Sequence, residues 1–267
     1  MKKLSIVTIN YNNVSGLITT LESICKETLP RNLVEFIVID GGSSDGSIGV
    51  INDYESYISF WLSEKDKGIF HAMNKGLSKA TGEYVIFMNS GDSFIIDVLT
   101  ETFIQQLGSA DIYYGDVIVQ VGEKSSSIKQ TSSLDFLYML GKTICHQSVF
   151  MKTTLCMKYS FTEDKDYSIT GDWIQLFSML KLEKLVVSYL NQPICIYNGE
   201  GQSEQFKELR QQQRNKYLEE FYSHWELNQL KELHRFRNRQ YYNLVIRSLD
   251  RYYVARILII LAKWLRV

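Results

Sequence analysis

Residues 35–47 read EFIVIDGGSSDGS, a run of apolar residues that ends in an acid and passes directly into a glycine-rich turn. The arrangement recurs at residues 84–92, YVIFMNSGD, where a second apolar run leads into a turn that contains an acid. Short apolar runs bounded by turn residues are typical of buried strands. In an open α/β sheet, ligands bind beyond the carboxyl ends of the strands, so we expect Asp40 and Asp92 to face a ligand rather than the core.

Strands and helices are predicted to alternate through the first 110 residues. The predicted strands are residues 4–9, 36–40, 58–62 and 84–88, and the predicted helices are residues 14–27, 69–79 and 94–107. This βαβ repetition predicts a largely parallel sheet with right-handed crossovers. After residue 111 the apolar runs are shorter, at 112–120, 145–151 and 184–197, with one helix at 171–180. We therefore expect an α/β domain with a mixed sheet over residues 1–203, followed by a helical extension over 204–267.

Composition and charge limit the class of protein. The 267 residues carry a formal net charge of −1, without the basic excess that nucleic-acid binding requires. The four cysteines lie far apart and form no Cys-x-x-Cys pair, so we expect reduced thiols in a cytoplasmic protein. The first strand follows almost directly on Met1, so no signal peptide is expected.

Four motifs follow one another in the first 92 residues. They are SIVTINYN at 5–12, IDGGSSDG at 39–46, DKGIFHAMNKG at 66–76 and NSGD at 89–92. In this order they resemble the family-2 glycosyltransferases, and most of all the branch that builds bacterial surface polysaccharides such as colanic acid and capsules. The resemblance covers residues 1–203. It implies the GT-A fold, a nucleotide-diphosphate-sugar donor, a divalent cation and inversion at the anomeric carbon, with residues 1–110 as the nucleotide-binding half and 111–203 as the acceptor-side half.

The resemblance places the nucleotide at the ends of the first two strands. Asp40 is expected to accept a hydrogen bond from the N–H of a pyrimidine base, and the alternative is that it only caps the following loop. Asp45 is the better cap, because it stands at the start of the next helix. The Tyr11 ring offers a stacking surface, although a lone tyrosine is more often a packing residue. The other expected nucleotide contacts are Thr8, Asn10, Lys67, Asn74, Ser90 and Gly91.

The NSGD turn stands where the family usually has an Asp-rich metal motif. Mg²⁺ and Mn²⁺ prefer oxygen ligands and bind through one or two carboxylates plus substrate phosphates, so one acid suffices if a diphosphate supplies the rest. We expect Asp92 to bind Mn²⁺ or Mg²⁺, with Asn89 adding a carbonyl oxygen or a water-mediated contact. His146 belongs to a His-Gln signature of this branch and is expected to line the metal or acceptor site. The alternatives are a turn shaped for backbone reasons and a structural histidine, and Gly91 replaces an acid found in many relatives.

Inverting sugar transfer is a single in-line displacement that needs a general base for the acceptor hydroxyl. Residues 168–173, SITGDW, resemble the family's acidic motif, in which the Asp at the head of a helix is the base, and this points to Asp172. A helix-capping role for Asp172 is compatible, since a cap fixes the direction of the carboxylate. Asp164 and Asp166 are nearby alternatives. Cys145 beside His146 is not expected to act as a nucleophile, because neighbours on a strand point to opposite faces.

Residues 251–266 combine apolar and basic side chains at helical spacing. Winding them as a helix places Trp264 on an apolar face and Arg256 on a basic one. The apolar run is shorter than the roughly 20 residues that a membrane span requires, so we expect this helix to lie on an anionic membrane surface. Packing on its own domain or on the second subunit of a homodimer is the alternative.

These features predict a metal-dependent inverting glycosyltransferase, cytoplasmic and peripheral on the inner face of the bacterial membrane. It is expected to add one sugar to a glycan or to a polyprenyl-diphosphate-linked acceptor, because the Gln-x-x-Arg-Trp motif of processive relatives is absent. The resemblance favours a UDP-sugar, with GDP or dTDP as alternatives. Two other classes remain open: a nucleotidyltransferase, whose glycine-rich phosphate loop is missing after the first strand, and a non-catalytic sugar-nucleotide-binding protein, which the thinned metal motif would allow.

Overall fold

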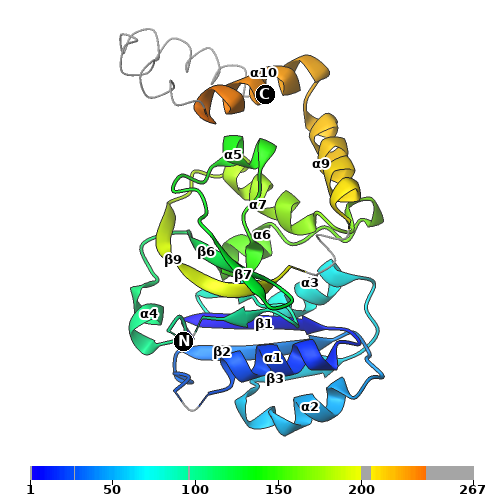
Figure 1. Ribbon diagram of the computed structural model, residues 1–267, viewed down its shortest axis with the longest axis vertical. Coiled ribbons are helices and arrows are strands. Elements are labelled where there is room, and N and C mark those ends of the chain that lie inside the picture. The colour runs from blue at the N-terminus through cyan, green and yellow to red at the C-terminus, as the bar shows by residue number, and fades with distance from the viewer. Residues whose placement is uncertain (1, 27, 96, 200–205, 239–267) are drawn as a thin grey trace.

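A curved mixed sheet with helices on both faces forms the centre of the molecule (Figure 1). The structure is a computed structural model that describes residues 2–26, 28–95, 97–199 and 206–238. Within these residues the sheet has nine strands in the order β3-β2-β1-β4-β8-β6-β9-β5, with β7 paired to β6. The mixed α/β fold that the sequence predicts is confirmed.

The first half of the chain builds the parallel part of the sheet. Strands β1 (Leu4–Asn10), β2 (Val34–Asp40), β3 (Phe60–Ser63) and β4 (Tyr84–Phe87) run in one direction. The pairing register places Asp40 level with Asn10 on one side and with Ser63 on the other. The carboxyl ends of these strands therefore meet at one edge, where polar residues replace apolar ones.

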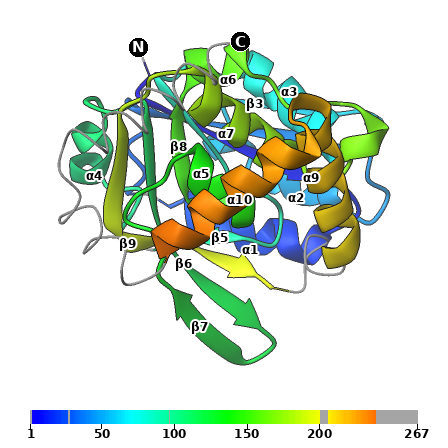
Figure 2. The same cartoon turned by 90° about the horizontal axis from the view of Figure 1, so that it is seen from above.

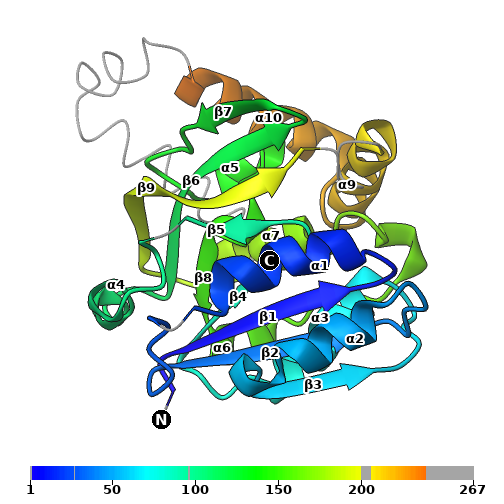
Figure 3. The same ribbon diagram turned by 60° about the horizontal axis from the view of Figure 1, so that its bottom comes forward.

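Alternating side chains of the parallel strands feed two separate apolar cores. On β1, Leu4 and Ile6 face one core while Val7 and Ile9 face the other, as the two-residue period of a strand requires. Helices α1 (Val14–Ile24) and α2 (Ser47–Asp53) cover the first face (Figure 3). Helix α3 (Ile69–Lys79) covers the second. These helices on the two faces of the sheet support the loops at the carboxyl ends of the parallel strands.

The second half of the chain adds antiparallel strands beside β4. Strand β8 (Val149–Lys152) pairs antiparallel with β4 and with β6 (Ile112–Val121), and β9 (Val187–Asn198) runs parallel to β6 and antiparallel to β5 (Ser93–Phe94). Strand β7 (Lys124–Ile128) is exposed and forms a hairpin with β6 that projects from the body (Figure 2). Helix α4 (Glu101–Gln106) precedes β6, and the described helices between β7 and β9 are α5 (Phe136–Gly141), α6 (Thr153–Lys158) and α7 (Gly171–Leu182). Short 3₁₀ turns lie at η1 (Glu55–Tyr57), η2 (His146–Ser148) and η3 (Lys165–Tyr167).

Two predicted elements differ in the structure. The helix predicted at residues 94–107 is wrong at its start, because Phe94 pairs with Cys195 of β9 and helix α4 begins only at Glu101. The strand predicted at 145–151 begins at Val149, and the residues before it form the turn η2. His146 and its neighbours therefore do not alternate across a strand. The structure of the first segment is determined by long-range strand pairing and that of the second by a tight turn. Local apolar spacing determines neither.

Helices α9 (Lys207–Phe221) and α10 (His224–Asn238) lie above α5 and α7 (Figures 1 and 2). Leu218, Tyr222, Leu227 and Leu230 are buried in the same core as α3 and α7. The helical extension thus shares the core of the α/β domain. None of the helices in the described part of the chain is long and apolar enough to cross a membrane. The amphipathic segment predicted at residues 251–266 lies outside the described residues.

Candidate active site

Asp40 is the centre of the polar network at the end of β2. Its Oδ2 accepts hydrogen bonds from the backbone N–H of Gly42 and Ser43 and from the Ser63 hydroxyl, at 2.6–3.1 Å. Its Oδ1 accepts from the Asn10 amide at 2.9 Å and from the Ser43 hydroxyl at 2.6 Å. Burial alone would raise the pKa of Asp40, but these hydrogen bonds outweigh it and hold the pKa below its ordinary value. Asp40 therefore shapes the loop after β2 as an ionised acceptor.

The predicted nucleoside residues of β1 gather around this network in different ways. Asn10 is buried against Asp40, and its Oδ1 has no hydrogen-bond partner among the described residues. Thr8 is buried and donates to the backbone oxygen of Met88 at 2.8 Å, which ties β1 to the end of β4. Tyr11 is 66% exposed and lies beside Gly41, where an added Cβ would come within 3.1 Å of its ring. A ring in this position is open to a stacking partner.

Asp45 holds the start of two helices in place. Its Oδ2 accepts from the backbone N–H of Val14 at 2.8 Å, and its Oδ1 accepts from the backbone N–H and hydroxyl of Ser47. The loop after β2 is thus fixed at both ends by acids, at Asp40 and at Asp45. It presents a preformed edge to any ligand that binds there.

The NSGD turn is locked by backbone geometry. Gly91 has φ = +104°, a left-handed value that favours glycine, and its N–H donates to Thr20 Oγ1 and to the Gly16 oxygen at 3.0 Å. The Ser90 backbone N–H bonds to the oxygen of Ile9, and its hydroxyl donates to the Asn13 oxygen. These contacts fasten the turn to β1 and α1. The left-handed backbone at position 91 explains why glycine suits this turn.

Asp92 is buried at the end of this turn, only 5% exposed. Its Oδ2 accepts from the Gln147 side-chain amide at 2.6 Å, and its Oδ1 accepts from the backbone N–H of Asn198 at 2.9 Å. Burial raises the pKa of Asp92 to about 6 in spite of these two hydrogen bonds. A carboxylate in this condition gains from a nearby positive charge.

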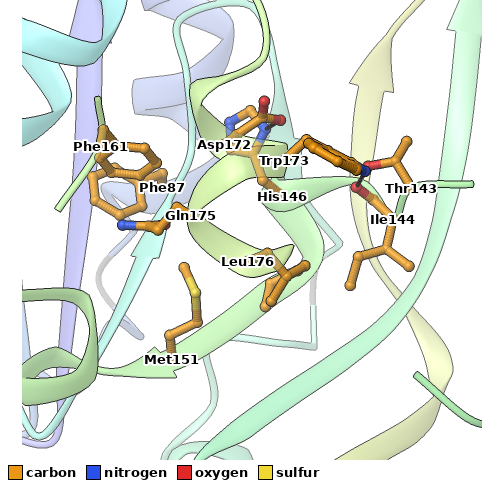
Figure 4. A pocket seen from close by; sticks show the side chains of 11 residues that line it. Phe87, Thr143, Ile144, His146, Met151, Phe161, Asp172, Trp173, Gln175 and Leu176 are labelled. Carbon is orange, nitrogen blue, oxygen red and sulfur yellow. Dashed lines mark hydrogen bonds and ion pairs between the residues drawn. The ribbon is translucent and has the colours of Figure 1, made fainter. Parts of the chain in front are cut away.

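Asp172 and His146 form a pair at one end of a small pocket (Figure 4). Asp172 stands in the first turn of α7, and its Oδ2 lies 3.2 Å from Nδ1 of His146. The other walls are mostly apolar, with Phe87, Met151 and Phe161 among them, and also include Gln175. The Asp172 side chain is 24% exposed to solvent.

The charge on Asp172 is stabilised by cationic and hydrogen-bonding neighbours. Burial would raise its pKa, but the interactions with His146, Arg214 and the backbone N–H of Trp173 outweigh burial and hold the pKa below its ordinary value. The position in the first turn of a helix adds the favourable helix dipole. Asp172 is therefore ionised at neutral pH and able to accept a proton.

Two consecutive residues connect the two acids. His146 contacts Asp172, and Gln147 donates to Asp92, both from the turn η2. Nε2 of the same histidine lies 3.2 Å from the amide nitrogen of Asn89. A neutral ring that donates its Nδ1–H to Asp172 would accept from Asn89 through Nε2. The residues predicted as metal site and as base therefore stand in one connected polar network.

Arg214 of α9 lies behind this network. Its guanidinium stands 5.3 Å from the centre of the Trp173 ring and interacts electrostatically with Asp172. Burial lowers the pKa of Arg214 to about 10, which leaves it a cation at neutral pH, and its Nε has no hydrogen-bond partner among the described residues. The side chain of Gln213, the preceding residue, bonds to Ser168, Ile169 and Thr170. Helix α9 therefore holds the loop that carries Asp172.

Two predicted nucleotide contacts lie on or near α3. The Asn74 amide bonds to the backbone of Phe161 and to the Glu163 carboxylate, so in this conformation it anchors the loop before η3. Lys67 is exposed at the start of the helix, and its backbone N–H donates to Nδ1 of His71. Both remain predictions as nucleotide contacts.

The residues around Asp92 suit a cation only in part. In the described residues no three His, Cys, Asp or Glu side chains come close enough to hold a metal by themselves. Asn89 Oδ1, however, is buried and has no hydrogen-bond partner among the described residues. An unpaired buried oxygen near an acid that gains from positive charge fits a hard divalent ion, with phosphate oxygens completing its shell. His146 fits less well as a ligand, since both of its ring nitrogens face protein groups.

Sequence reasoning missed Gln147 and Arg214 as members of the site. Gln147 was inside the His-Gln signature, but its contact with Asp92 depends on the turn η2, which local spacing does not reveal. Arg214 lies in a polar helical segment with no motif to mark it. Arg214 is recognised as part of the site by its burial in the folded 31 kDa protein, and this burial cannot be read from the sequence.

Comparison with known proteins decides the family. Residues 5–168 match the model for glycosyl transferase family 2. The chain belongs to glycosyl transferase family 2. A PGL/p-HBAD biosynthesis glycosyltransferase of Mycobacterium bovis is 28% identical over 204 residues, which cover 74% of this chain and 77% of that protein. The predicted family is thereby confirmed, and the protein is a glycosyltransferase.

Solved structures of glycosyltransferases resemble most of this chain. S. aureus TarS, residues 1–349 in complex with UDP, gives a TM-score of 0.64 at 18% identity and covers 94% of this chain and 76% of that chain. A mannosyltransferase from Pyrobaculum calidifontis in complex with GDP-Man and Mn²⁺ gives a TM-score of 0.56 at 16% identity, over 78% of this chain and 60% of that one. These likenesses confirm the GT-A fold for this family-2 glycosyltransferase.

Proposed function

We propose that this family-2 glycosyltransferase transfers one sugar, with inversion, from a nucleotide-diphosphate sugar to a glycan or polyprenyl-diphosphate-linked acceptor in bacterial surface-polysaccharide biosynthesis. UDP-sugars are the favoured donors, because TarS structures contain UDP and UDP-GlcNAc, whereas the mannosyltransferase structure contains GDP-Man. The exposed Tyr11 ring at the carboxyl edge, next to the Asp40 loop, supports a nucleoside at this position.

One observation carries the proposal: the adjacent residues His146 and Gln147 each bond to one of the two acids, Asp172 and Asp92. A base for the acceptor and an acid for the donor's diphosphate must stand on opposite sides of one reacting carbon. A single turn that touches both acids keeps them at a fixed separation. Pre-set geometry of this kind is what an in-line displacement requires.

The chemistry assigned to the chain is a proton transfer at Asp172. The acceptor oxygen attacks C1 of the sugar, the bond between C1 and the diphosphate oxygen breaks, and the hydroxyl proton passes to the Asp172 carboxylate. General-base help of this kind is typically worth about 10²–10⁴-fold in rate. His146 orients the carboxylate, and Arg214 keeps it charged until the proton arrives.

The leaving group needs separate stabilisation. A divalent cation held by Asp92 and Asn89 would neutralise the charge that grows on the departing diphosphate. Mn²⁺ accompanies GDP-Man in the mannosyltransferase structure, which supports Mn²⁺ or Mg²⁺ as the ion here. Gln147 and the backbone of Asn198 would keep Asp92 oriented toward it.

Membrane contact belongs to the proposal as well. The basic, apolar segment 251–266 would bring the enzyme to the inner face of the membrane, where a lipid-linked acceptor is found. Removal of residues 251–267 should then abolish binding to anionic vesicles and leave donor binding intact.

The decisive experiment pairs donor binding with turnover. A panel of nucleotide sugars is tested for thermal stabilisation with and without Mn²⁺, and the stabilising donor is then used to measure transfer or hydrolysis. The Asp172→Asn variant should keep the stabilisation and lose turnover by about 10²–10⁴-fold. Asp166→Asn tests the alternative base and is expected to keep turnover, because Asp166 is 61% exposed and pairs with Lys216 on the surface.

The outcomes separate the classes of protein. Equal losses in Asp172→Asn and Asp166→Asn would remove Asp172 as the base. Donor binding without any turnover in the unmodified protein would favour a sugar-nucleotide-binding protein. Release of pyrophosphate from a nucleoside triphosphate would favour a nucleotidyltransferase.

A further inference from the structure

A second pocket lies on the acceptor side, between the segment after β7, helix α5 and helix α10. Its volume is about 300 Å³, which is at the lower end of pockets that hold small ligands. Lys129, Lys142 and His234 contribute its basic groups. Thr131, Ser133 and Tyr138 contribute hydroxyl groups to the same walls.

The charged side chains that line this pocket are all positive. Its lining includes two lysines and no carboxylate, in a protein whose formal net charge is only −1. Two acids outside the lining bond to the backbone of lining residues: Asp116 accepts from the N–H of Gln130 and from the Tyr189 hydroxyl, and Asp135 caps α5 by accepting from the N–H of Tyr138. Concave surfaces lined by one sign of charge concentrate ligands of the opposite sign.

Hydrogen bonds connect the pocket to the polar network that contains Asp92 and Asp172. Gln130, in its wall, donates to the Ser148 hydroxyl at 2.8 Å, and Ser148 follows directly on Gln147 in the turn η2. Trp173, next to Asp172, donates its indole N–H to the Met139 oxygen of α5 at 3.0 Å. Lys142 precedes His146 by four residues, and four extended residues span at most roughly 14 Å. The pocket residue Lys142 is therefore separated by one short chain segment from His146, which contacts the proposed base Asp172.

We propose that this pocket binds a phosphate or diphosphate group of the acceptor and so places the acceptor hydroxyl toward Asp172. The inference rests on the proposed function, since it concerns the second substrate of that reaction. Lysine ammonium groups bind phosphate as mobile point charges, and neighbouring hydroxyls supply further hydrogen bonds. The tie through α5 and η2 gives such binding a direct effect on the position of His146.

The test uses inorganic phosphate and farnesyl phosphate as probes. The full-length protein is first saturated with UDP and Mg²⁺, so that the donor site is filled, and broadening of the ³¹P line of each probe is measured. The Lys129→Ala/Lys142→Ala variant should bind both probes about tenfold more weakly, a loss of about 1.4 kcal/mol, because both ammonium groups of the pocket are removed. Lys124→Ala/Lys184→Ala is the matched control, since it removes the same charge from exposed positions outside the pocket.

Each result decides the proposal. Weaker binding in the pocket variant alone supports it, and tighter binding of farnesyl phosphate than of phosphate then identifies a lipid-linked acceptor rather than the anion by itself. No binding in the presence of UDP, or equal binding by the two double variants, overturns it. UDP affinity is measured in the same samples, so loss of the donor site is distinguished from loss of this pocket, and the melting temperature shows that each variant is folded.

Discussion

The turn between β4 and β5 depends on a left-handed backbone at Gly91. With φ = +104°, this position strains any residue that has a Cβ, although the nearest atoms to an added Cβ are 3.6 Å away or more. Strain of the backbone, and not lack of space, therefore excludes other residues. The conformation of the NSGD turn therefore favours glycine at position 91.

We expect Gly91→Ala to destabilise the protein by about 1–3 kcal/mol, the usual range for a side chain forced into the left-handed region. Gly91→Asp should do the same and should not improve metal-dependent stabilisation, because a new carboxylate cannot compensate for a distorted turn. Urea denaturation measures both. Gly49→Ala is the control, because Gly49 lies in helix α2 with open space around it and should be neutral or stabilising. A Gly91→Asp variant that is stable and binds Mn²⁺ more tightly would contradict this account.

His146 is expected to act through Asp172 rather than on the donor. His146→Ala should lower kcat by at least about 10-fold, because a poorly oriented Asp172 loses part of its contribution as general base. The affinity for UDP should stay unchanged. Because the interaction with His146 helps to hold the pKa of Asp172 down, its loss should also move the acid limb of the kcat profile to higher pH. A fall in UDP affinity with an unmoved profile would indicate a donor-side role instead.

The positions of the acids at the strand ends could be predicted from the sequence. Asp40 and Asp92 follow apolar runs that had to be buried strands, so their position at the carboxyl edge follows from the sequence alone. Their partners were not predictable. Gln147 reaches Asp92 from 55 residues away, across a turn that resembles a strand in sequence.

At the scale of elements, helix α9 supports the loop that leads to the proposed base. Gln213 bonds to the loop of residues 168–170, Tyr167 bonds to Glu220, and the Arg214 guanidinium lies over the Trp173 ring. The loop before α7 thus depends on a helix about 40 residues later in the chain. A truncation that removes α9 is expected to loosen Asp172 even though the nucleotide-binding half is untouched.

Arg214→Met tests this dependence, because it keeps most of the packing on Trp173 and removes the charge. The Arg214 charge lowers the pKa of Asp172, so its loss raises that pKa. A base with a higher pKa becomes protonated at higher pH, and kcat should then fall at a higher pH than in the unmodified enzyme. Arg214→Lys should restore the profile in part.

Lys216→Ala is the matched control on the same helix. Its partner Asp166 is exposed, and surface ion pairs contribute only about 0–1 kcal/mol. Its pH profile should equal that of the unmodified enzyme. An Arg214→Met profile that also stays in place would show that α9 acts on Asp172 only by packing.

Element boundaries were predicted well where one face of a helix or strand is buried, and poorly where distant strands meet. Helix α3 occupies the predicted residues 69–79, because its apolar stripe is continuous. Phe94 was assigned to a helix on the same kind of spacing, yet its backbone pairs with Cys195, about 100 residues away. Nothing local signals such a pairing.

At the scale of the molecule, Glu35 connects the first strands to the turn before β4. Its carboxylate accepts from the Ser5 hydroxyl and from the backbone N–H groups of Thr81 and Gly82, and the residue is only 7% exposed. Burial would raise the pKa of Glu35, but these hydrogen bonds outweigh it and lower the pKa below 4.5. A lowered carboxyl pKa means that ionised Glu35 stabilises the fold above pH 4.5, and that this contribution is lost as the pH falls through the lower folded value.

We expect Glu35→Gln to reduce the free energy of unfolding at pH 7 by about 1–3 kcal/mol, since the amide nitrogen cannot accept from these donors. The difference from the unmodified protein should shrink below pH 4.5. Urea denaturation at several pH values measures it. Glu219→Gln on the exposed side of α9 should show no such trend. A difference that is constant with pH would mean that packing, and not charge, is responsible.

The turn η2 has a consequence for how relatives of this enzyme diversify. Because His146 and Gln147 are neighbours, we expect a shift of this turn that suits a new acceptor to disturb Asp92 as well, the proposed ion-binding acid 55 residues earlier. If both proposed roles hold, donor chemistry and acceptor choice cannot change independently at this turn. New specificities are expected to arise instead in parts such as the solvent-exposed β6–β7 hairpin, which can change length without disturbing either acid.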